Sequence, residues 1–294
     1  MFKNKNKNKY NVGEMNNYLS NIRTDMADEI GVETSHSKSG NINKSKVVVD
    51  SALSKRINKP SGTYITVQSD VVINSDKEYF RELVLALRDS LLELGKMQNC
   101  LVVGLGNAYL TADALGNKAV QKIIVTRHFV DDLGDSLGVV SALTPSVLGI
   151  TGVESFDVIK GVVDRIKPSC IIAIDSLASS TIGRLATAFQ VSNAGITPGS
   201  GVGNSRVTLN QQNLGCPVYS IGVPLVVYIS TILNEIANKH PNTVDQDKLD
   251  EVEDLVVAPK DIDMLVDGCA NIVSQAINLA LHPKLDIDDL FKYL

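Results

Sequence analysis

The sequence predicts an α/β protein, because β-rich apolar runs alternate with helical patterns through residues 100–238. Two of these runs, Leu101–Val103 and Ile171–Ile174, are short and uninterrupted, as expected of strands that are buried on both faces. The stretch Asp76–Leu94 has apolar residues at the spacing of an amphipathic helix, and Gly95 follows as a stop. A sheet with packed helices is therefore the expected core.

The other elements follow from the same patterns. Further strands are expected at Val47–Val49, Tyr64–Val67, Val139–Leu143, Phe189–Val191 and Val218–Ile221. Further helices are expected at Asp113–Val125 or part of it, Glu154–Ile166, Pro224–Asn238, Asp261–Leu281 and Ile287–Tyr293. Pro224 is assigned to a first helical turn, where a missing N–H costs nothing. Residues 31–46 and 239–258 are polar and are expected to be loops.

Composition excludes several classes of protein. The 294 residues are 44% hydrophobic and 21% charged, with a net charge of −5, which argues against non-specific nucleic-acid binding by the whole chain. No apolar stretch has the length of a membrane span, and the basic N-terminus lacks the apolar region of a secretory signal. The four cysteines are scattered and form no CxxC pair, which predicts buried free thiols and a reducing cytoplasm.

The N-terminal leader differs in composition from the rest of the chain. It contains a Lys-Asn repeat over Lys3–Lys9, a low-complexity stretch that cannot contribute to a core. We therefore expect residues 1–25 to be detachable and residues 26–294 to form a single α/β domain.

Two aspartates follow predicted strands. Asp113 comes after the strand Leu101–Val103 and the turn at Gly104-Leu-Gly-Asn107, near an expected helix start, and Asp175 directly follows Ile171–Ile174. Sites in open α/β sheets gather beyond the carboxyl ends of the strands. Each aspartate alone could be structural, as a helix cap or in an ion pair. Together they could act as general acid and general base.

Other motifs give weaker signals. The turn after Leu101–Val103 has only a GxG pattern, and the loop Gly199–Gly203 lacks the lysine of a phosphate-binding loop, so nucleotide binding is disfavoured. The glycines Gly199, Gly201 and Gly203 could instead line a cleft and bind substrate backbone. The histidines show no metal-ligand spacing, and we expect neither a metal nor a cofactor. Arg127 and His128 are candidates for supporting residues of the site.

Several longer blocks of the sequence follow one another in a characteristic order: Val103–Asn107, Thr111–Gly116, Val125–His128, Gly149–Glu154, Ile172–Ser179, Gly195–Asn204, Ile221–Pro224 and Val257–Lys260. In sequence and order these blocks resemble the germination protease family of spore-forming Firmicutes. The resemblance extends from about Ile22 to Leu285, which is nearly the whole chain.

The resemblance implies a fold and an activity. The fold would be a three-layer α/β arrangement, a twisted and mostly parallel sheet with helices on both faces, similar to hydrogenase maturation endopeptidases. The activity would be that of an atypical aspartic endopeptidase that starts the degradation of small acid-soluble spore proteins during germination. The family's two essential aspartates correspond by motif to Asp113 and Asp175.

The resemblance also implies regulation by processing. Family members are tetrameric zymogens of the spore cytoplasm that remove their own N-terminal segment, cutting after an acidic residue and before a large apolar residue, Ala and another acidic residue. Here the segment Arg23–Glu29 fits that pattern, which predicts cleavage between Asp25 and Met26. The implied location is the forespore and spore core, with the spore proteins as partners and no direct contact with nucleic acid or membrane.

Three positions depart from the family pattern. Ala112 and Asn117 stand where the family usually has proline, and Ala108-Tyr109 stands where it usually has an aromatic Trp. Two alternatives remain: a non-catalytic homologue that binds spore proteins, and a metal-assisted peptidase.

Overall fold

One mixed sheet runs through the computed structural model, which describes residues 23–69, 77–129, 137–198, 207–239, 252 and 254–288. Its strands are β1 (Ser35–Ser39), β2 (Ile42–Val49), β3 (Gly62–Ser69), β4 (Cys100–Gly104), β5 (Val140–Leu143), β6 (Cys170–Ser179), β7 (Ala188–Ser192), β8 (Val218–Tyr228) and β9 (Val256–Val257). Their order in space is β1-β2-β3-β7-β8-β6-β4-β5, and β9 pairs with β8.

The sheet has a parallel half and an antiparallel half. Strands β5, β4, β6 and β8 pair in parallel. Strands β1, β2, β3 and β7 pair antiparallel with one another and, through β7, with β8. The predicted α/β class is confirmed, although the sheet is mixed rather than mostly parallel. Both predicted aspartates belong to the parallel half.

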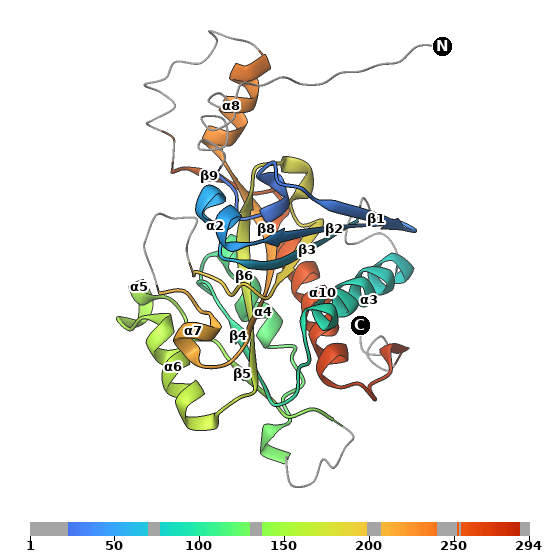
Figure 1. Cartoon of the computed structure of the whole chain (residues 1–294), viewed down its shortest axis with the longest axis vertical. Helices are drawn as coiled ribbons and strands as arrows, with labels where there is room; N and C mark the ends of the chain where they lie inside the picture. The colour runs from blue at the N-terminus through green and yellow to red at the C-terminus, as the bar shows by residue number, and fades with distance from the viewer. Residues whose placement is uncertain are drawn as a thin grey trace.

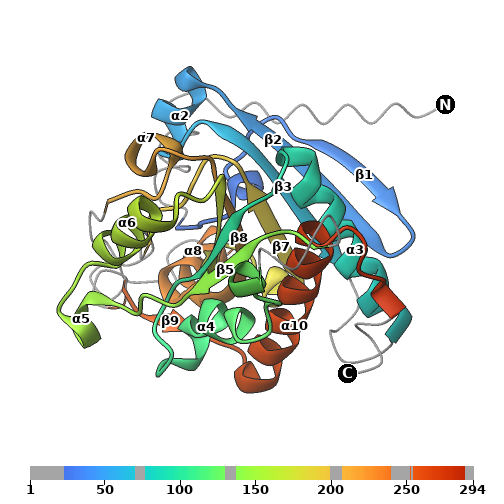
Figure 2. The same ribbon diagram turned by 90° about the horizontal axis from the view of Figure 1, so that it is seen from below.

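Helices cover both faces of the sheet, as predicted (Figures 1 and 2). One face carries α3 (Lys77–Leu94), α4 (Leu115–Val120) and α10 (Ile262–Leu281), and the other carries α5 (Leu148–Thr151), α6 (Ser155–Ile166) and α7 (Gln211–Leu214). The remaining helices are α2 (Ser51–Ile57), α8 (Ile229–Lys239) and the short 3-10 helices η1 (Ala27–Glu29), η2 (Thr111–Asp113), η3 (Arg127–Phe129) and η4 (Ile182–Arg184).

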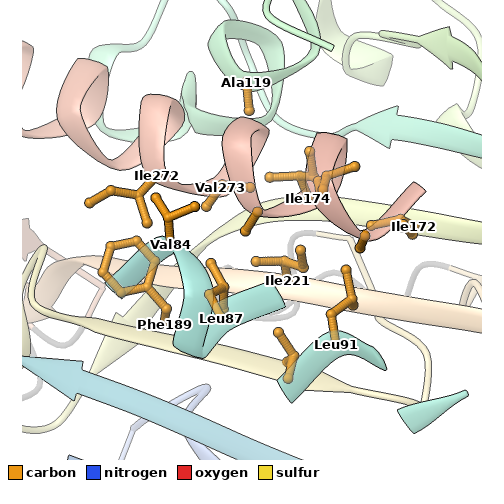
Figure 3. Close-up of a cluster of buried hydrophobic side chains, with 14 of the residues drawn as sticks. Val84, Leu87, Leu91, Ala119, Ile172, Ile174, Phe189, Ile221, Ile272 and Val273 are labelled. Atoms are coloured by element: carbon orange, nitrogen blue, oxygen red, sulfur yellow. The ribbon is translucent and has the colours of Figure 1, made fainter. Parts of the chain in front are cut away.

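Alternation along the central strands divides the core between these two faces. Even-numbered residues of β6 such as Ile172 and Ile174 belong to the cluster under α3 and α10, and Ile171 and Ala173 belong to the cluster under α6. Figure 3 shows part of the first cluster, in which labelled side chains of α3, α4 and α10 lie among those of β6, β7 and β8. Strand β6 is therefore buried on both faces, which explains its unbroken apolar sequence.

Helix α10 is the longest helix among the described elements. It is apolar and long enough to cross a membrane, but 78% of its most apolar window is buried inside the protein. Its fully buried residues include Cys269, Ile272 and Val273, which belong to the cluster under α3. Helix α10 is thus a core helix of this fold, and its burial accounts for its hydropathy.

Two predictions about secondary structure were wrong. The polar stretch 31–46 contains β1 and most of β2, whose edge strand β1 is exposed along its whole length and so shows no apolar pattern. The predicted helix Pro224–Asn238 is divided, because β8 continues to Tyr228 before α8 begins. Pro224 pairs with Leu177 where the register of β6 and β8 shifts, and at such an irregularity a strand tolerates a missing N–H.

Candidate active site

Asp113 is held by a tight loop at the carboxyl end of β4. It is the last residue of η2, and its Oδ2 accepts a hydrogen bond of 2.8 Å from the backbone N–H of Asn107. Gly106 has a φ of +90°, and a Cβ at this position would lie 2.0 Å from the carbonyl oxygen of Asp113. Only glycine therefore permits this close approach of the loop to Asp113.

Asn117 of α4 forms hydrogen bonds to the same loop. Its side-chain amide donates to the carbonyl oxygens of Gly106 at 3.1 Å and of Leu105 at 3.4 Å, and the residue is buried. The residue that departs from the family pattern thus supplies hydrogen bonds that a proline cannot make. The N-cap position of α4 is occupied by Ala114, so Asp113 is not the N-cap residue of this helix.

Asp175 lies within β6 rather than at its end. The predicted strand ended at Ile174, but β6 continues to Ser179 because it still pairs with β8 there. Asp175 is buried, with 7% of its surface exposed, and its Oδ1 accepts a hydrogen bond from the N–H of Ser176. By alternation its side chain is on the α6 face, like Ile171 and Ala173.

Strand pairing brings the two aspartates to the same region of the sheet. Gly104, the last residue of β4, pairs with Ile174, and the N–H of Leu105 donates to the Ile174 carbonyl at 2.8 Å. The loop that carries Asp113 therefore starts beside the residue that precedes Asp175.

The segment with the predicted cleavage site lies against the end of β6. The N–H of Asp25 donates to the carbonyl of Ala178 at 2.9 Å, and the N–H of Ala178 donates to Oδ2 of Asp25 at 2.9 Å. Met26 is fully buried and packs in a cluster with Leu177 and Ala188. The residues on both sides of the predicted cut are thus fixed to the strand that carries Asp175.

Acidic side chains after the predicted cut are paired as well. Arg184 donates to both carboxylate oxygens of Asp28, at 2.6 and 2.7 Å, and the Asp28 side chain is only 3% exposed. Burial by itself would raise the pKa of Asp28, but the hydrogen bonds and charge of Arg184 outweigh it, so the pKa is lowered. Glu29 accepts hydrogen bonds from Ser179 Oγ at 2.6 Å and from the N–H of Ser180 at 2.7 Å.

Gln190 of β7 contacts the backbone of the segment on both sides of Met26. Its Oε1 accepts from the N–H of Ala27 at 2.8 Å, and its Nε2 lies 3.5 Å from the carbonyl oxygen of Asp25, at the outer limit of a hydrogen bond. Gln190 is in register with Gly222, which is in register with Asp175, so the three residues form one row across the sheet. Sequence reasoning missed Gln190; the only signal was one polar residue inside the apolar strand Phe189–Val191.

The other sequence-predicted residues are not brought to this region. Arg127 donates to Asn99 and to the carbonyl of Ile166, and Asn99 directly precedes β4, so Arg127 lies at the opposite end of that strand from the Asp113 loop. The ring of His128 contacts Phe129. The glycines Gly199, Gly201 and Gly203 lie outside the described residues.

The described residues also include the cysteines and the side chains that could bind a metal ion. All four cysteines are buried and free, as predicted. Among the residues with described positions, no group of three or more His, Cys, Asp or Glu side chains could hold a metal ion.

Comparisons with known proteins point to one family. The family profile described as "Germination protease" matches residues 11–240. Curated germination proteases are similar over most of their length: that of Clostridium tetani is 36% identical over 93% of this chain and 99% of its own, and that of Caldanaerobacter subterraneus is 40% identical over 81% and 84%. That of Halalkalibacterium halodurans is 30% identical over 96% and 99%.

One solved structure is similar at lower identity. The [NiFe] hydrogenase maturation protease HycI from Thermococcus kodakarensis aligns with 65% of this chain and 98% of its own, at 16% identity and a TM-score of 0.35. Similarity at this level concerns the fold alone.

Proposed function

The chain belongs to the germination protease family and is an A25 peptidase, and from this premise we propose that it starts the degradation of small acid-soluble spore proteins as a self-processing zymogen. The proposed processing cut is between Asp25 and Met26. It would remove the Lys-Asn-rich leader and leave residues 26–294 as the active chain.

The docking of the cleavage segment is the observation that carries this proposal. The sequence Asp25-Met26-Ala27-Asp28 has the acidic, apolar, Ala, acidic order of the family's cleavage sites. It lies against the last residues of β6, the strand that also contains Asp175. A peptide of the substrate type therefore already occupies the face of the sheet where Asp175 is placed.

The proposed chemistry is hydrolysis by water between Asp113 and Asp175. One carboxylate, ionised, takes a proton from water, whose oxygen bonds to the scissile carbonyl carbon. The other carboxyl group, protonated, donates its proton to the leaving nitrogen as the C–N bond breaks. This division requires the two carboxyl groups to share one site, because like charges close together do not both ionise readily.

The proposed setting follows from the family. The chain would assemble as a homotetramer in the forespore and spore core, with small acid-soluble spore proteins as its substrates. Neither a metal nor an organic cofactor takes part in the proposed reaction. A binding-only homologue is disfavoured because both aspartates are present.

The test incubates a chain that begins at Met26 with a small acid-soluble spore protein, beside Asp113→Asn and Asp175→Asn variants. We expect cleavage after an acidic residue by the parent chain and none by either variant, with mass spectrometry locating the cut and circular dichroism verifying the fold. Cleavage that survives either substitution contradicts the aspartate pair. Loss of activity on adding a chelator would indicate a metal-assisted peptidase instead.

A further inference from the structure

The contacts of residues 24–29 are, position by position, those that a protease needs in order to recognise the side chains of its cleavage motif. The acidic residue before the bond, Asp25, is bound by the N–H of Ala178, and the charge of Lys59 lies close enough to interact with it. The apolar residue after the bond, Met26, fills a closed site against Leu177 and Ala188. Each of these contacts selects the side chain type that the motif requires.

The second and third residues after the bond, Ala27 and Asp28, also make contacts that depend on their side chain type. Ala27 is fully buried in a cluster with Val47 and Tyr64, where a larger side chain has no room, since interiors are close-packed. Asp28 forms the two-pronged ion pair with Arg184, whose planar guanidinium matches a carboxylate.

We propose that Arg184 and Gln190 are, respectively, a specificity-determining and a positioning residue of this protease, acting first on Thr24–Glu29 and then on any peptide that binds there once the new N-terminus, Met26–Glu29, leaves these contacts after processing. The inference rests on the proposed function and deepens it. Arg184 selects an acidic side chain three residues after the scissile bond. Gln190 holds the scissile peptide through the carbonyl oxygen before the bond and the second N–H after it.

The geometry of Gln190 suits a role in the reaction step as well as in binding. Its Oε1 contact of 2.8 Å is a full hydrogen bond that fixes the peptide, whereas its Nε2 contact of 3.5 Å is long. Contacts that tighten as charge develops on a carbonyl oxygen accelerate hydrolysis more than they strengthen binding. Strand spacing places the Cα atoms of Gln190 and Asp175 about 10 Å apart across Gly222, with both side chains on the same face.

The first experiment is a charge exchange in the full chain, read as the first-order rate of self-cleavage at Asp25–Met26. Arg184→Glu and Asp28→Lys are each expected to slow cleavage about tenfold or more, the usual effect of losing a charge-assisted hydrogen bond. The double variant is expected to recover most of the rate. Arg88→Glu, the same charge change on α3 beyond the opposite face of the sheet, is the matched control and should have no effect.

The second experiment excludes a purely structural role for the ion pair. Two synthetic peptides spanning residues 20–32, one natural and one with Lys in place of Asp28, are offered to the processed chain and to its Arg184→Glu variant. We expect the preference to invert, with kcat/KM favouring the acidic peptide in the parent and the Lys peptide in the variant. An unchanged preference, together with no recovery in the charge exchange, would overturn the assignment of Arg184.

The third experiment separates positioning from binding at Gln190. Gln190→Glu keeps an acceptor for the Ala27 N–H and loses the Nε2 donor, so it is expected to lower kcat about tenfold or more while KM changes little. Gln190→Met loses the acceptor as well and should also raise KM. A peptide whose Met–Ala amide is an ester lacks the N–H that Oε1 accepts; it should be a poor substrate for the parent, and the Met variant should lose less on it than on the amide peptide, because only the Nε2 contact is left to lose. Additive losses, or an unchanged kcat in folded variants, would overturn the role of Gln190.

Failure of the proposed function gives a different result. If the unsubstituted full chain does not cut itself and the processed chain cuts neither peptide, then the protease proposal fails and the subsites fail with it. If the unsubstituted chain cuts normally and the variants match it, only the subsite assignment is overturned.

Discussion

Replacing Gly106 by alanine tests whether the loop at the end of β4 positions Asp113. At a φ of +90° an alanine is strained by about 1–2 kcal/mol. Its Cβ would also lie 2.0 Å from the Asp113 carbonyl oxygen, so the loop must move, which costs about 1–3 kcal/mol more. We expect Gly106→Ala to lower the free energy of unfolding by about 2–5 kcal/mol in total. A misplacement of this kind slows catalysis about a hundredfold.

Gly152 provides the matched control. Its φ is +70°, and a Cβ there would meet nothing within 4 Å, so Gly152→Ala carries the backbone strain without the clash. Urea unfolding and the rate of spore-protein cleavage are measured for both variants. We expect Gly152→Ala to cost about 1 kcal/mol and leave the rate unchanged. If Gly106→Ala is no less stable and no slower than Gly152→Ala, the loop does not position Asp113 as argued.

Three further predictions concern Asn117, Asp28 and the four buried cysteines. Asn117→Ala removes the donor to two loop carbonyls and should lower the free energy of unfolding by about 1–2 kcal/mol and slow cleavage; an unchanged rate would show that Asn117 does not hold the catalytic loop. The pKa of Asp28 is lowered in the folded chain, so its stabilisation is present above its unfolded pKa of 3.8 and is lost as pH falls through the folded value. Asp28→Asn should therefore cost about 3 kcal/mol at neutral pH, with the difference from the parent shrinking below pH 3.8 in urea unfolding; a difference independent of pH contradicts the ion pair. The four cysteines are buried, so a thiol reagent should label the native chain only after denaturant is added, and rapid labelling without denaturant would show that the core opens.

The local apolar pattern predicted secondary structure well where a strand is buried on both faces or a helix has one continuous buried face. The strand β4 and the helices α3, α6 and α10 match their predicted ranges closely, because long amphipathic helices and doubly buried strands carry strong apolar signals. The strand β6 was predicted to end at Ile174 and continues to Ser179. Pattern failed at β1, which is an exposed edge strand, and at Pro224, which lies at a register shift between β6 and β8. In both places a neighbouring strand, rather than the local sequence, decides the conformation.

The sequence by itself determined the α/β class, the family's motifs and the two aspartates, since these depend on residue type and short spacing. Only the tertiary structure placed Gln190 and Arg184 on the residues around Asp25–Met26. These contacts join positions more than 150 residues apart in the chain, and no local pattern encodes them. They depend on strand order and register, which set β7 and the end of β6 beside the N-terminal segment.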